Sequence, residues 1–202
     1  MLMDEQDSQL VLIDYQPRLM AVIQGAPEVL ANAGRLAQAA RALAVPVWGT
    51  EQNPQRLGEL PPELREHCRK VLPKLAFSAV AEGLADWLRP PAKPAGGNAR
   101  SLPKHLQKPA PQAAGNGRNA IVLAGCETHI CVLQTALELL EDEFEVWVVT
   151  DACGSRTDRN RDAAFDRLAG AGAELVTTEM VIFEWLQSAE HPEFKTLQAL
   201  VR

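Results

Sequence analysis

The sequence predicts an α/β fold built on a mainly parallel β-sheet with helices on both faces. Short runs of β-branched and other apolar residues alternate along the chain with longer amphipathic segments. This order is typical of strand–helix–strand crossovers. With 202 residues, of which 47% are hydrophobic, the chain is long enough for one core of this kind and short for two. We therefore expect a single domain over residues 1–202.

The N-terminal part contains two predicted strands with a helix between them. The first strand, Leu10–Asp14 (LVLID), ends in a carboxylate, and the second is Val45–Thr50 (VPVWGT). Pro46 lies near the start of the second strand, where a missing hydrogen-bond donor is tolerated. Between them, the segment Pro27 to Ala44 has apolar residues at helical spacing and begins with a proline suited to a first turn.

The middle of the chain is expected to be less regular. Asn53 to Lys74 contains four prolines and is predicted to be irregular. Ser78 to Leu88 is predicted to be a short helix with Ser78 as its N-cap. Residues 89–119 are rich in Pro, Gly, Ala and basic residues with almost no periodicity, which predicts a long surface loop inserted in the domain.

The C-terminal part returns to alternating strands and helices. The expected order is a strand, a helix, a strand, a helix, a strand and a helical end, namely Ala120–Gly125, Thr128 to Glu141, Glu145–Asp151, Arg161–Gly170, Glu174–Thr177 and the remainder, with a break at His191–Pro192.

Composition excludes several classes of function. The net charge is −6 and no basic stripe is interleaved with aromatics, which argues against a nucleic-acid binder. The start, MLMDEQDSQL, lacks the pattern of a secretory signal, and no apolar run approaches the roughly 20 residues that span a bilayer. The four cysteines form no CxxC pair, which favours reduced thiols. We expect a cytoplasmic protein that acts on a small molecule, without membrane or nucleic-acid partners.

Three residues could bring chemistry to one edge of the sheet. In a parallel sheet, ligands bind beyond the carboxyl ends of the strands. Asp14 ends the first strand, Cys131 lies in the first turn of the helix after the strand Ala120–Gly125, and Lys74 closes the proline-rich segment. A cysteine at a helix N-terminus beside a lysine is favoured as a thiolate, and a carboxylate can take and return its proton.

Each of these residues also has an ordinary structural interpretation. A strand-ending aspartate is commonly a cap, Lys74 could face solvent, and Cys131 could be a small core residue. Spacing alone leaves both interpretations open, because the three residues are far apart in the chain.

Longer stretches of the sequence resemble a known family. These stretches are LVLIDYQ, PVWGTEQNPQRLG, LPKLAFSAV, VLAGCETHICVLQTALELLEDEFEVWVVTDACGSR and the C-terminal AELVTTEMVIFEWL. They resemble the isochorismatase-like cysteine hydrolases, and within them the isochorismatase-domain-containing branch. The most specific motif is 125–132, where strand, turn and cysteine follow one another. The resemblance covers nearly the whole chain except residues 89–119, a segment that looks longer than is usual for the family.

The resemblance implies a three-layer α/β/α sandwich around a six-stranded parallel sheet and a catalytic triad of Asp14, Lys74 and Cys131. In the family's usual scheme, the cysteine attacks an amide or related carbonyl to form a thioester. The leaving group takes a proton from the aspartate, water hydrolyses the thioester, and the lysine holds the charges in place. The implied activity is that of an amidase-like hydrolase without a cofactor.

The resemblance also implies the geometry around the nucleophile. The family has a cis peptide at the position of Cys126–Glu127, and the backbone amides of Glu127 and Cys131 would form an oxyanion hole. Cys126 is then a structural turn residue.

A catalytic metal is not expected. The nicotinamidase branch of the family binds a metal through an Asp and histidines after the second strand, whereas TEQNPQRLG has no histidine here. His129 precedes Cys131 by two residues, a spacing that points the two side chains apart on a helix, so it is expected to line the pocket or an interface.

Further residues are expected near the substrate. Tyr15, Gln16, Gln52, Phe77 and Thr128 are candidate pocket residues, although Gln16 and Gln52 could equally tie loops together and Phe77 could be core. Asp151 is expected to brace the backbone and Arg156 to pair across a contact. The family resemblance and the apolar segment Met180–Leu186 imply a homo-oligomer, a dimer or larger.

Two other functions fit the same fold. One is a non-catalytic interaction protein that uses the loop 89–119 as its contact element. The other is a thiol redox sensor in which Cys131 oxidises reversibly.

Overall fold

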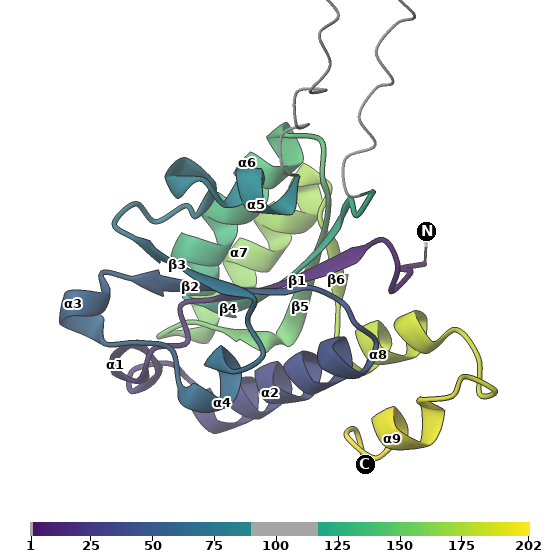
Figure 1. Cartoon of the computed structure of the whole chain (residues 1–202). Helices are drawn as coiled ribbons and strands as arrows, with labels where there is room; N and C mark the ends of the chain where they lie inside the picture. Colours follow the sequence, from purple (N-terminus) through teal and green to yellow (C-terminus); the bar gives the residue numbers. More distant parts are fainter. Residues whose placement is uncertain (1, 90–116) are drawn as a thin grey trace, which may run out of the picture.

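The computed structural model describes residues 2–89 and 117–202, and a six-stranded sheet forms its centre (Figure 1). All neighbouring strands are parallel, in the order β3-β2-β1-β4-β5-β6. The strands are β1 (Ser8–Ile13), β2 (Val47–Gln52), β3 (Lys70–Lys74), β4 (Ala120–Cys126), β5 (Glu145–Gly154) and β6 (Glu174–Val176). The predicted parallel sheet is confirmed.

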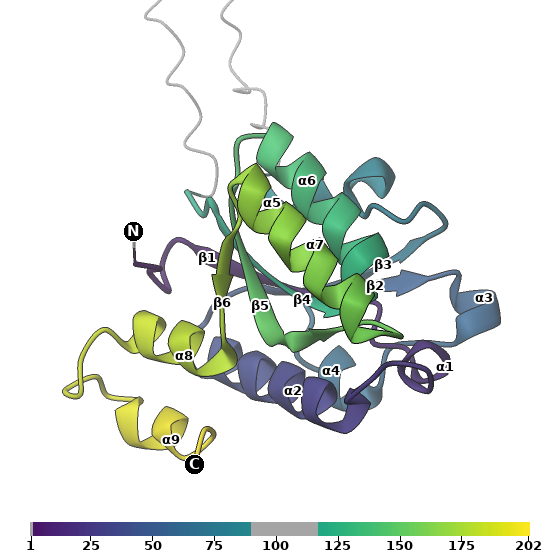
Figure 2. The ribbon, with the colours of Figure 1, turned by 180° about the vertical axis from the view of Figure 1, so that it is seen from behind.

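Helices cover both faces of this sheet. Figures 1 and 2 show α2, α8 and α9 on one side and α5, α6 and α7 on the other, which is the expected three-layer sandwich. The helices are α1 (Pro17–Met20), α2 (Ala26–Ala42), α3 (Pro54–Leu57), α4 (Pro62–Arg65), η1 (Val80–Glu82), α5 (Leu84–Leu88), η4 (Thr128–Val132), α6 (Leu133–Glu141), α7 (Asp158–Ala171), α8 (Thr178–Leu186) and α9 (Phe194–Gln198). None of them is long and apolar enough to cross a bilayer, a statement that covers the described residues only.

The core is divided by the sheet into two layers. Along β1, Leu10 and Leu12 join the layer under α2 and α8, while Val11 and Ile13 join the layer under α6. This alternation follows from the period of two along a strand, and every residue of β1 is buried because the strand is central.

The strand order reverses between β1 and β4, because β2 follows β1 on one side and β4 pairs with it on the other. Such a switch point opens a crevice at the carboxyl ends of the two strands. Asp14 and Glu127 are the residues that directly follow β1 and β4 there.

The segment 53–74 is the main departure from the predicted elements. Pro54 and Pro62 start α3 and α4 as first-turn residues, and Pro73 lies within β3. A proline is tolerated in β3 because this strand is at the edge of the sheet and pairs only with β2. The prediction of an irregular segment up to Lys74 was therefore wrong for its last five residues, which form β3.

Two predicted helices also differ in detail. The helix predicted over 78–88 is split into η1 and α5 at Gly83, which has a φ of 94°. The helix predicted from Thr128 begins with the π-helical turn η4 before α6. Most of the predicted loop 89–119 lies outside the described residues.

Candidate active site

Asp14 is placed by the end of β1 and is completely buried. Its backbone has a φ of 55°, a left-handed conformation in which Asp is enriched among residues other than glycine. The Oδ1 atom accepts a hydrogen bond of 2.6 Å from the hydroxyl of Thr50, which lies on the neighbouring strand β2. The Oδ2 atom lies 2.7 Å from Lys74 Nζ in an ion pair whose two side chains are both 0% exposed.

Lys74 reaches this aspartate because it is the last residue of β3. Its ammonium also donates to Gln52 Oε1 at 2.6 Å and to the Phe77 carbonyl at 3.0 Å. A buried ammonium is tolerated only when it is paired and hydrogen-bonded, and both conditions are met here. The unpredicted strand β3 is thus the element that brings Lys74 across β2 towards β1.

Cys131 approaches from the opposite side of the switch point, on the turn η4 after β4. It is 5% exposed, and its Sγ atom lies 3.9 Å from Gln52 Oε1, the oxygen that also accepts a hydrogen bond from Lys74. Residues from β1, β3 and the turn after β4 therefore converge, although 117 positions separate Asp14 from Cys131.

The surroundings of the Cys131 thiol raise its pKa and so favour the protonated form at neutral pH. Burial of the sulfur and the negative charge of Asp14 raise its pKa from 9.0 to about 12, and the positive charge of Lys74 opposes this only in part. The expectation of a thiolate, based on a helix N-terminus beside a lysine, is therefore corrected. The positive charge of Lys74 lowers the pKa of the sulfur, but the negative charge of Asp14 beside it has the larger, opposite effect.

The turn that carries Cys131 is tied down by polar contacts. The peptide between Cys126 and Glu127 is cis, as the family resemblance implies. The carboxylate of Glu127 lies 3.0 Å from Arg156 Nε and 3.7 Å from His129 Nδ1. His129 Nδ1 is also 3.0 Å from the hydroxyl of Ser155.

The pairing of Glu127 with Arg156 was not predicted from the sequence. Arg156 was expected to pair across a subunit or domain contact, but it pairs with Glu127 within the chain and connects the end of β5 to the nucleophile turn. The sequence contained a signal for this pair. Arg156 comes shortly after the end of β5 and Glu127 directly after the end of β4, and the ends of neighbouring parallel strands lie together. Asp151 does brace backbone, by accepting hydrogen bonds from the amide and hydroxyl of Thr178 at the start of α8.

The remaining candidate residues are placed in different surroundings. Tyr15 is fully buried in the core layer under α2 and α8, with its hydroxyl bonded to the Ala152 carbonyl, so it does not reach the Cys131 side of the sheet. Gln16 ties loops together through the backbone of Gln52 and Gly58. Phe77 is 52% exposed beside the site.

Gln52 contacts the proposed reacting groups, and Thr128 belongs to the turn η4 that carries Cys131. Gln52 bridges Lys74 and Cys131 as described above, while its Nε2 atom donates to the Leu75 carbonyl. Thr128 is fully buried, and its hydroxyl has no hydrogen-bond partner among the described residues. An unpaired buried hydroxyl next to the nucleophile turn is suited to bonding a bound ligand.

Metal ligands do not gather in the described part of the chain, where no three His, Cys, Asp or Glu side chains form a group that could hold a metal ion. Whether the protein works without a metal stays a prediction.

The fold and the site define a hydrolase-like α/β protein with a buried cysteine, a carboxylate within its electrostatic reach and a lysine that pairs with the carboxylate, all at the switch point of a parallel sheet. Comparison with known proteins supports the hydrolase-like fold. A family model described as the isochorismatase domain matches residues 107–180. Isochorismatase domain-containing protein 2 of Xenopus laevis is 35% identical over 197 residues, covering 98% of this chain and 84% of its own. The chain therefore belongs to the isochorismatase family.

Solved structures share the fold. A structure described as MAR1 ribonuclease from Caenorhabditis elegans aligns with a TM-score of 0.82 and 31% identity, over 100% of this chain and 92% of its own. The YcaC gene product of Escherichia coli, described as an octameric hydrolase of unknown specificity, aligns with a TM-score of 0.73 and 22% identity, over 98% and 95% of the two chains.

Proposed function

We propose that this protein is a hydrolase that cleaves a small amide or related acyl compound through a thioester on Cys131, without a metal. The observation that carries the proposal is the buried Lys74–Asp14 ion pair, 2.7 Å long, whose two charges both act on the Cys131 thiol. Apart from this ion pair, Asp14 Oδ2 receives no hydrogen bond from the described residues, which leaves it able to take a proton.

The proposed reaction starts from a neutral thiol. As the sulfur bonds to the substrate carbonyl carbon, its proton moves to Asp14, and the same proton then leaves with the amine when the C–N bond breaks. A water molecule next gives a proton to Asp14 and its oxygen to the thioester carbon. The acid departs, and the sulfur takes the proton back from Asp14. The sum is amide plus water giving acid plus amine.

Two backbone amides are proposed to stabilise the developing oxyanion, those of Glu127 and Cys131. The Glu127 backbone already acts on the thiol, since its hydrogen bond lowers the pKa of Cys131 against the larger effects that raise it. A donor of this kind is typically worth about 3–4 kcal/mol in the transition state.

Lys74 is proposed to keep Asp14 charged in a dry site until the thiol gives up its proton. Gln52 is proposed to fix the position of the Cys131 sulfur relative to the Lys74 ammonium, because its Oε1 atom contacts both. The 5% exposure of Cys131 restricts access to small substrates.

The test uses intact-mass spectrometry and a panel of small primary amides. We expect Cys131→Ala to abolish turnover and the acyl adduct, while Cys68→Ser, which changes another free thiol outside the site, keeps both. Wild-type turnover by Cys131→Ala would refute the nucleophile. Ammonia release without any mass adduct in quenched wild-type samples would refute the thioester.

RNA hydrolysis is the second activity to test, because the Caenorhabditis elegans structure, 31% identical to this chain, is described as a ribonuclease. A phosphodiester needs cations around its transferring phosphate, whereas Lys74 is already committed to Asp14. Cleavage of RNA that survives in Cys131→Ala but not in a mock preparation would favour this second activity over the first.

A redox-sensor role receives less support from the placement of the thiols. Cys126 packs in the core layer under α2 and α8, 3.6 Å from Met20 Sδ, and Cys131 belongs to the opposite layer. The two sulfurs are thus on different sides of the sheet. A non-catalytic interaction protein remains the alternative if no substrate is turned over.

An apolar surface on α8 supports self-association of the protein. Met180 and Phe183 project from α8 beside Leu2 around a cavity of about 580 Å³, and Leu2 is 73% exposed. We propose that this apolar surface packs on a second copy; the Escherichia coli YcaC structure is described as octameric, which supports self-association. A monomer in sedimentation at micromolar concentration would contradict this. Reduced cysteines fit the proposed cytoplasmic location.

A further inference from the structure

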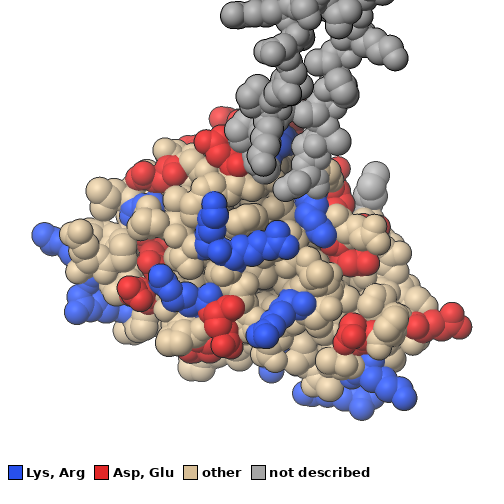
Figure 3. Space-filling model, in the orientation of Figure 1, with Lys and Arg blue, Asp and Glu red and all other residues tan. Residues whose placement is uncertain are grey.

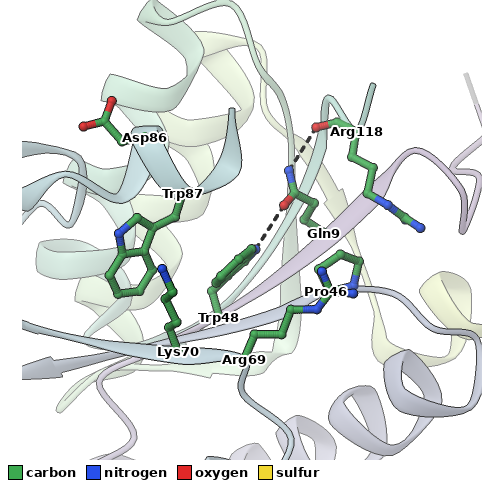
Figure 4. Close-up of a pocket in the computed structure, with 8 residues that line it drawn as sticks. All are labelled: Gln9, Pro46, Trp48, Arg69, Lys70, Asp86, Trp87 and Arg118. Carbon is green, nitrogen blue, oxygen red and sulfur yellow. Dashed lines mark hydrogen bonds between the residues drawn. The ribbon is translucent and has the colours of Figure 1, made fainter. Parts of the chain in front are cut away.

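A cavity lies at the amino ends of the strands, whereas Cys131 lies beyond their carboxyl ends. It has a volume of about 350 Å³ and is lined by residues at the amino ends of the strands, including Gln9 of β1, Trp48 of β2 and Lys70 of β3 (Figure 4). The catalytic residues proposed above follow the carboxyl ends of the strands. The two sites are therefore separated by the length of the sheet.

Three cations line this cavity. They are Arg69, Lys70 and Arg118, and none of them forms an ion pair within the described part of the chain. The single acidic lining residue is Asp86, whose carboxylate Figure 4 shows on the far side of Trp87 from the two arginines. Residues 90–116 contain no Asp or Glu and so have no carboxylate to offer the three cations.

The positive charges are close enough to act on one another. The pKa of Arg118 is lowered by burial first and by the charge of Arg69 second, while Asp4, Glu5 and Asp7 oppose this. Arg118 is held in place by a hydrogen bond of 2.8 Å from Nη1 to the Ser8 carbonyl. The face in Figure 3 shows a group of Lys and Arg side chains near its centre. Clustered cations without an ion-pair partner attract anionic ligands.

The floor and one wall of the cavity are aromatic. Trp48 donates its Nε1–H to Gln9 Oε1 at 3.0 Å, and Gln9 Nε2 donates to the Arg118 carbonyl at 3.0 Å, so the polar groups of the floor are satisfied (Figure 4). The ring of Trp87 lies 5.9 Å from that of Trp48, and Lys70 Nζ lies 5.2 Å from the Trp87 centroid. Both indoles offer apolar surface to a ligand. The Nε1–H of Trp48 is already bonded to Gln9 and is not available as a donor.

From this arrangement we propose that the cavity binds a small organic anion, with its phosphate or carboxylate group at Arg69, which Figure 4 shows between Lys70 and Arg118, and its flat apolar part against Trp48 and Trp87. The volume is in the range of small-molecule sites. Charge-assisted bonds from guanidinium groups fix the anion, and the indoles select a ligand with a ring over a free inorganic ion. The site is independent of the proposed hydrolase activity.

The experiment follows the indole N–H signals of ¹⁵N-tryptophan-labelled full-length protein by NMR during titration with adenosine 5′-monophosphate. Adenosine supplies the ring without the anion, and inorganic phosphate supplies the anion without the ring. We expect the monophosphate to shift the Trp48 and Trp87 signals saturably, to leave those of Trp147 and Trp185 in place, and to bind more tightly than either fragment. Trp87→Phe assigns the Trp87 signal.

Arg69→Ser is the decisive variant. Arg69 is exposed and makes no side-chain hydrogen bond or ion pair among the described residues, so its removal should leave the fold intact. We expect the monophosphate to bind roughly tenfold more weakly or worse, the effect of losing a hydrogen bond to a charged group. Arg159→Ser, which removes an exposed arginine on α7, is the matched control and should bind as the wild type does.

Three results would overturn the proposal. They are the absence of saturable shifts with the monophosphate, equal affinity in Arg69→Ser and wild type, and phosphate binding as tightly as the monophosphate. The last result would remove the aromatic contact from the site. Hydrolase assays run in parallel with Arg69→Ser should show wild-type turnover of small amides, because Arg69 is at the other edge of the sheet.

Discussion

At the scale of single residues, the site depends on the opposite charges of Asp14 and Lys74 and on their effects on the thiol of Cys131. Lys74 pairs with Asp14 across 2.7 Å. The pKa of the Cys131 thiol is raised mainly by burial and then by the charge of Asp14, which outweighs the opposite effect of Lys74. The sequence indicated all three residue types but overstated the ionisation of the sulfur. Spacing along the chain does not reveal that Lys74 is saturated by Asp14, Gln52 and the Phe77 carbonyl.

Replacing Asp14 with Asn should separate thiol reactivity from turnover. Asn retains the left-handed backbone preference and can still accept from the Thr50 hydroxyl. The buried Lys74 loses its ion-pair partner and the variant is less stable, so circular dichroism must first show that it is folded under the assay conditions. The negative charge that raises the pKa of Cys131 is removed, while the positive charge of Lys74 remains. We expect faster alkylation of Cys131 by iodoacetamide at about pH 8, by roughly tenfold for each unit by which the thiol pKa falls.

Turnover by the same variant should be lost, because Asn can neither accept nor return the proton. Fragment-ion mass spectrometry locates the label on Cys131, and Asp14→Asn combined with Cys131→Ser supplies the unlabelled control. Slower alkylation in Asp14→Asn would show that the carboxylate activates the resting thiol, contrary to the charge distribution described here.

At the scale of secondary-structure elements, the central strands and the edge strand β6 were predictable from the sequence, and the other edge strand, β3, was not. The strands β1, β4 and β5 contain continuous apolar runs, as expected for strands buried on both faces. The strand β3 contains Pro73 and two lysines, and it is recognisable only once its place at the sheet edge is known. The position of Lys74 in the site was therefore implied by family resemblance and not by local pattern.

The close approach of β1 and β4 at the switch point requires a glycine at position 125. A Cβ built on Gly125 would lie 2.4 Å from the carbonyl oxygen of Ile13, which is the partner of Gly125 in the strand register. Gly125→Ala must therefore push the two backbones apart. We expect a loss of about 1–3 kcal/mol in the free energy of unfolding, the usual cost of overpacking a core. Urea denaturation measures it.

Gly34→Ala is the matched control for this substitution. Gly34 lies within α2, and a Cβ added there would meet no atom within 4 Å, so alanine should be neutral or stabilise the helix by up to about 1 kcal/mol. Gly125→Ala should also reduce turnover beyond its effect on stability, because it moves Asp14 relative to Cys131. Equal stability of the two variants would contradict the close packing.

At the scale of the whole molecule, the sheet separates two apolar layers, and every cysteine in the described residues is unpaired. Alternation of strands and helices was enough to predict the layers. The cavity at the amino ends of the strands was not predictable, because Gln9, Trp48, Arg69 and Arg118 are scattered through the sequence and meet only through the strand order. Residues that share an edge of a parallel sheet have no common local signature.

Burial of the thiols makes the stability of the folded protein sensitive to alkaline pH. Burial raises the pKa of Cys153 from 9.0 to about 12, and it is the main cause of the same rise at Cys131. Between these values the unfolded chain releases thiol protons that the folded protein retains, so the unfolded state binds fewer protons and the free energy of unfolding falls as pH rises. Above pH 9, each such thiol lowers the free energy of unfolding by an amount that approaches about 1.4 kcal/mol per pH unit. Well below pH 9 it has no effect on the free energy of unfolding.

The Cys153→Ala variant isolates one of these contributions, because alanine fills nearly the same buried space without a titrating group. Urea unfolding from about pH 8 to about pH 10.5, under reducing conditions, should show wild-type stability falling more steeply than that of Cys153→Ala, with the gap between the two curves changing by up to about 1.4 kcal/mol per pH unit. Parallel curves across this range would mean that the Cys153 thiol titrates alike in both states, and that water reaches the layer beneath α6 and α7 in the folded protein.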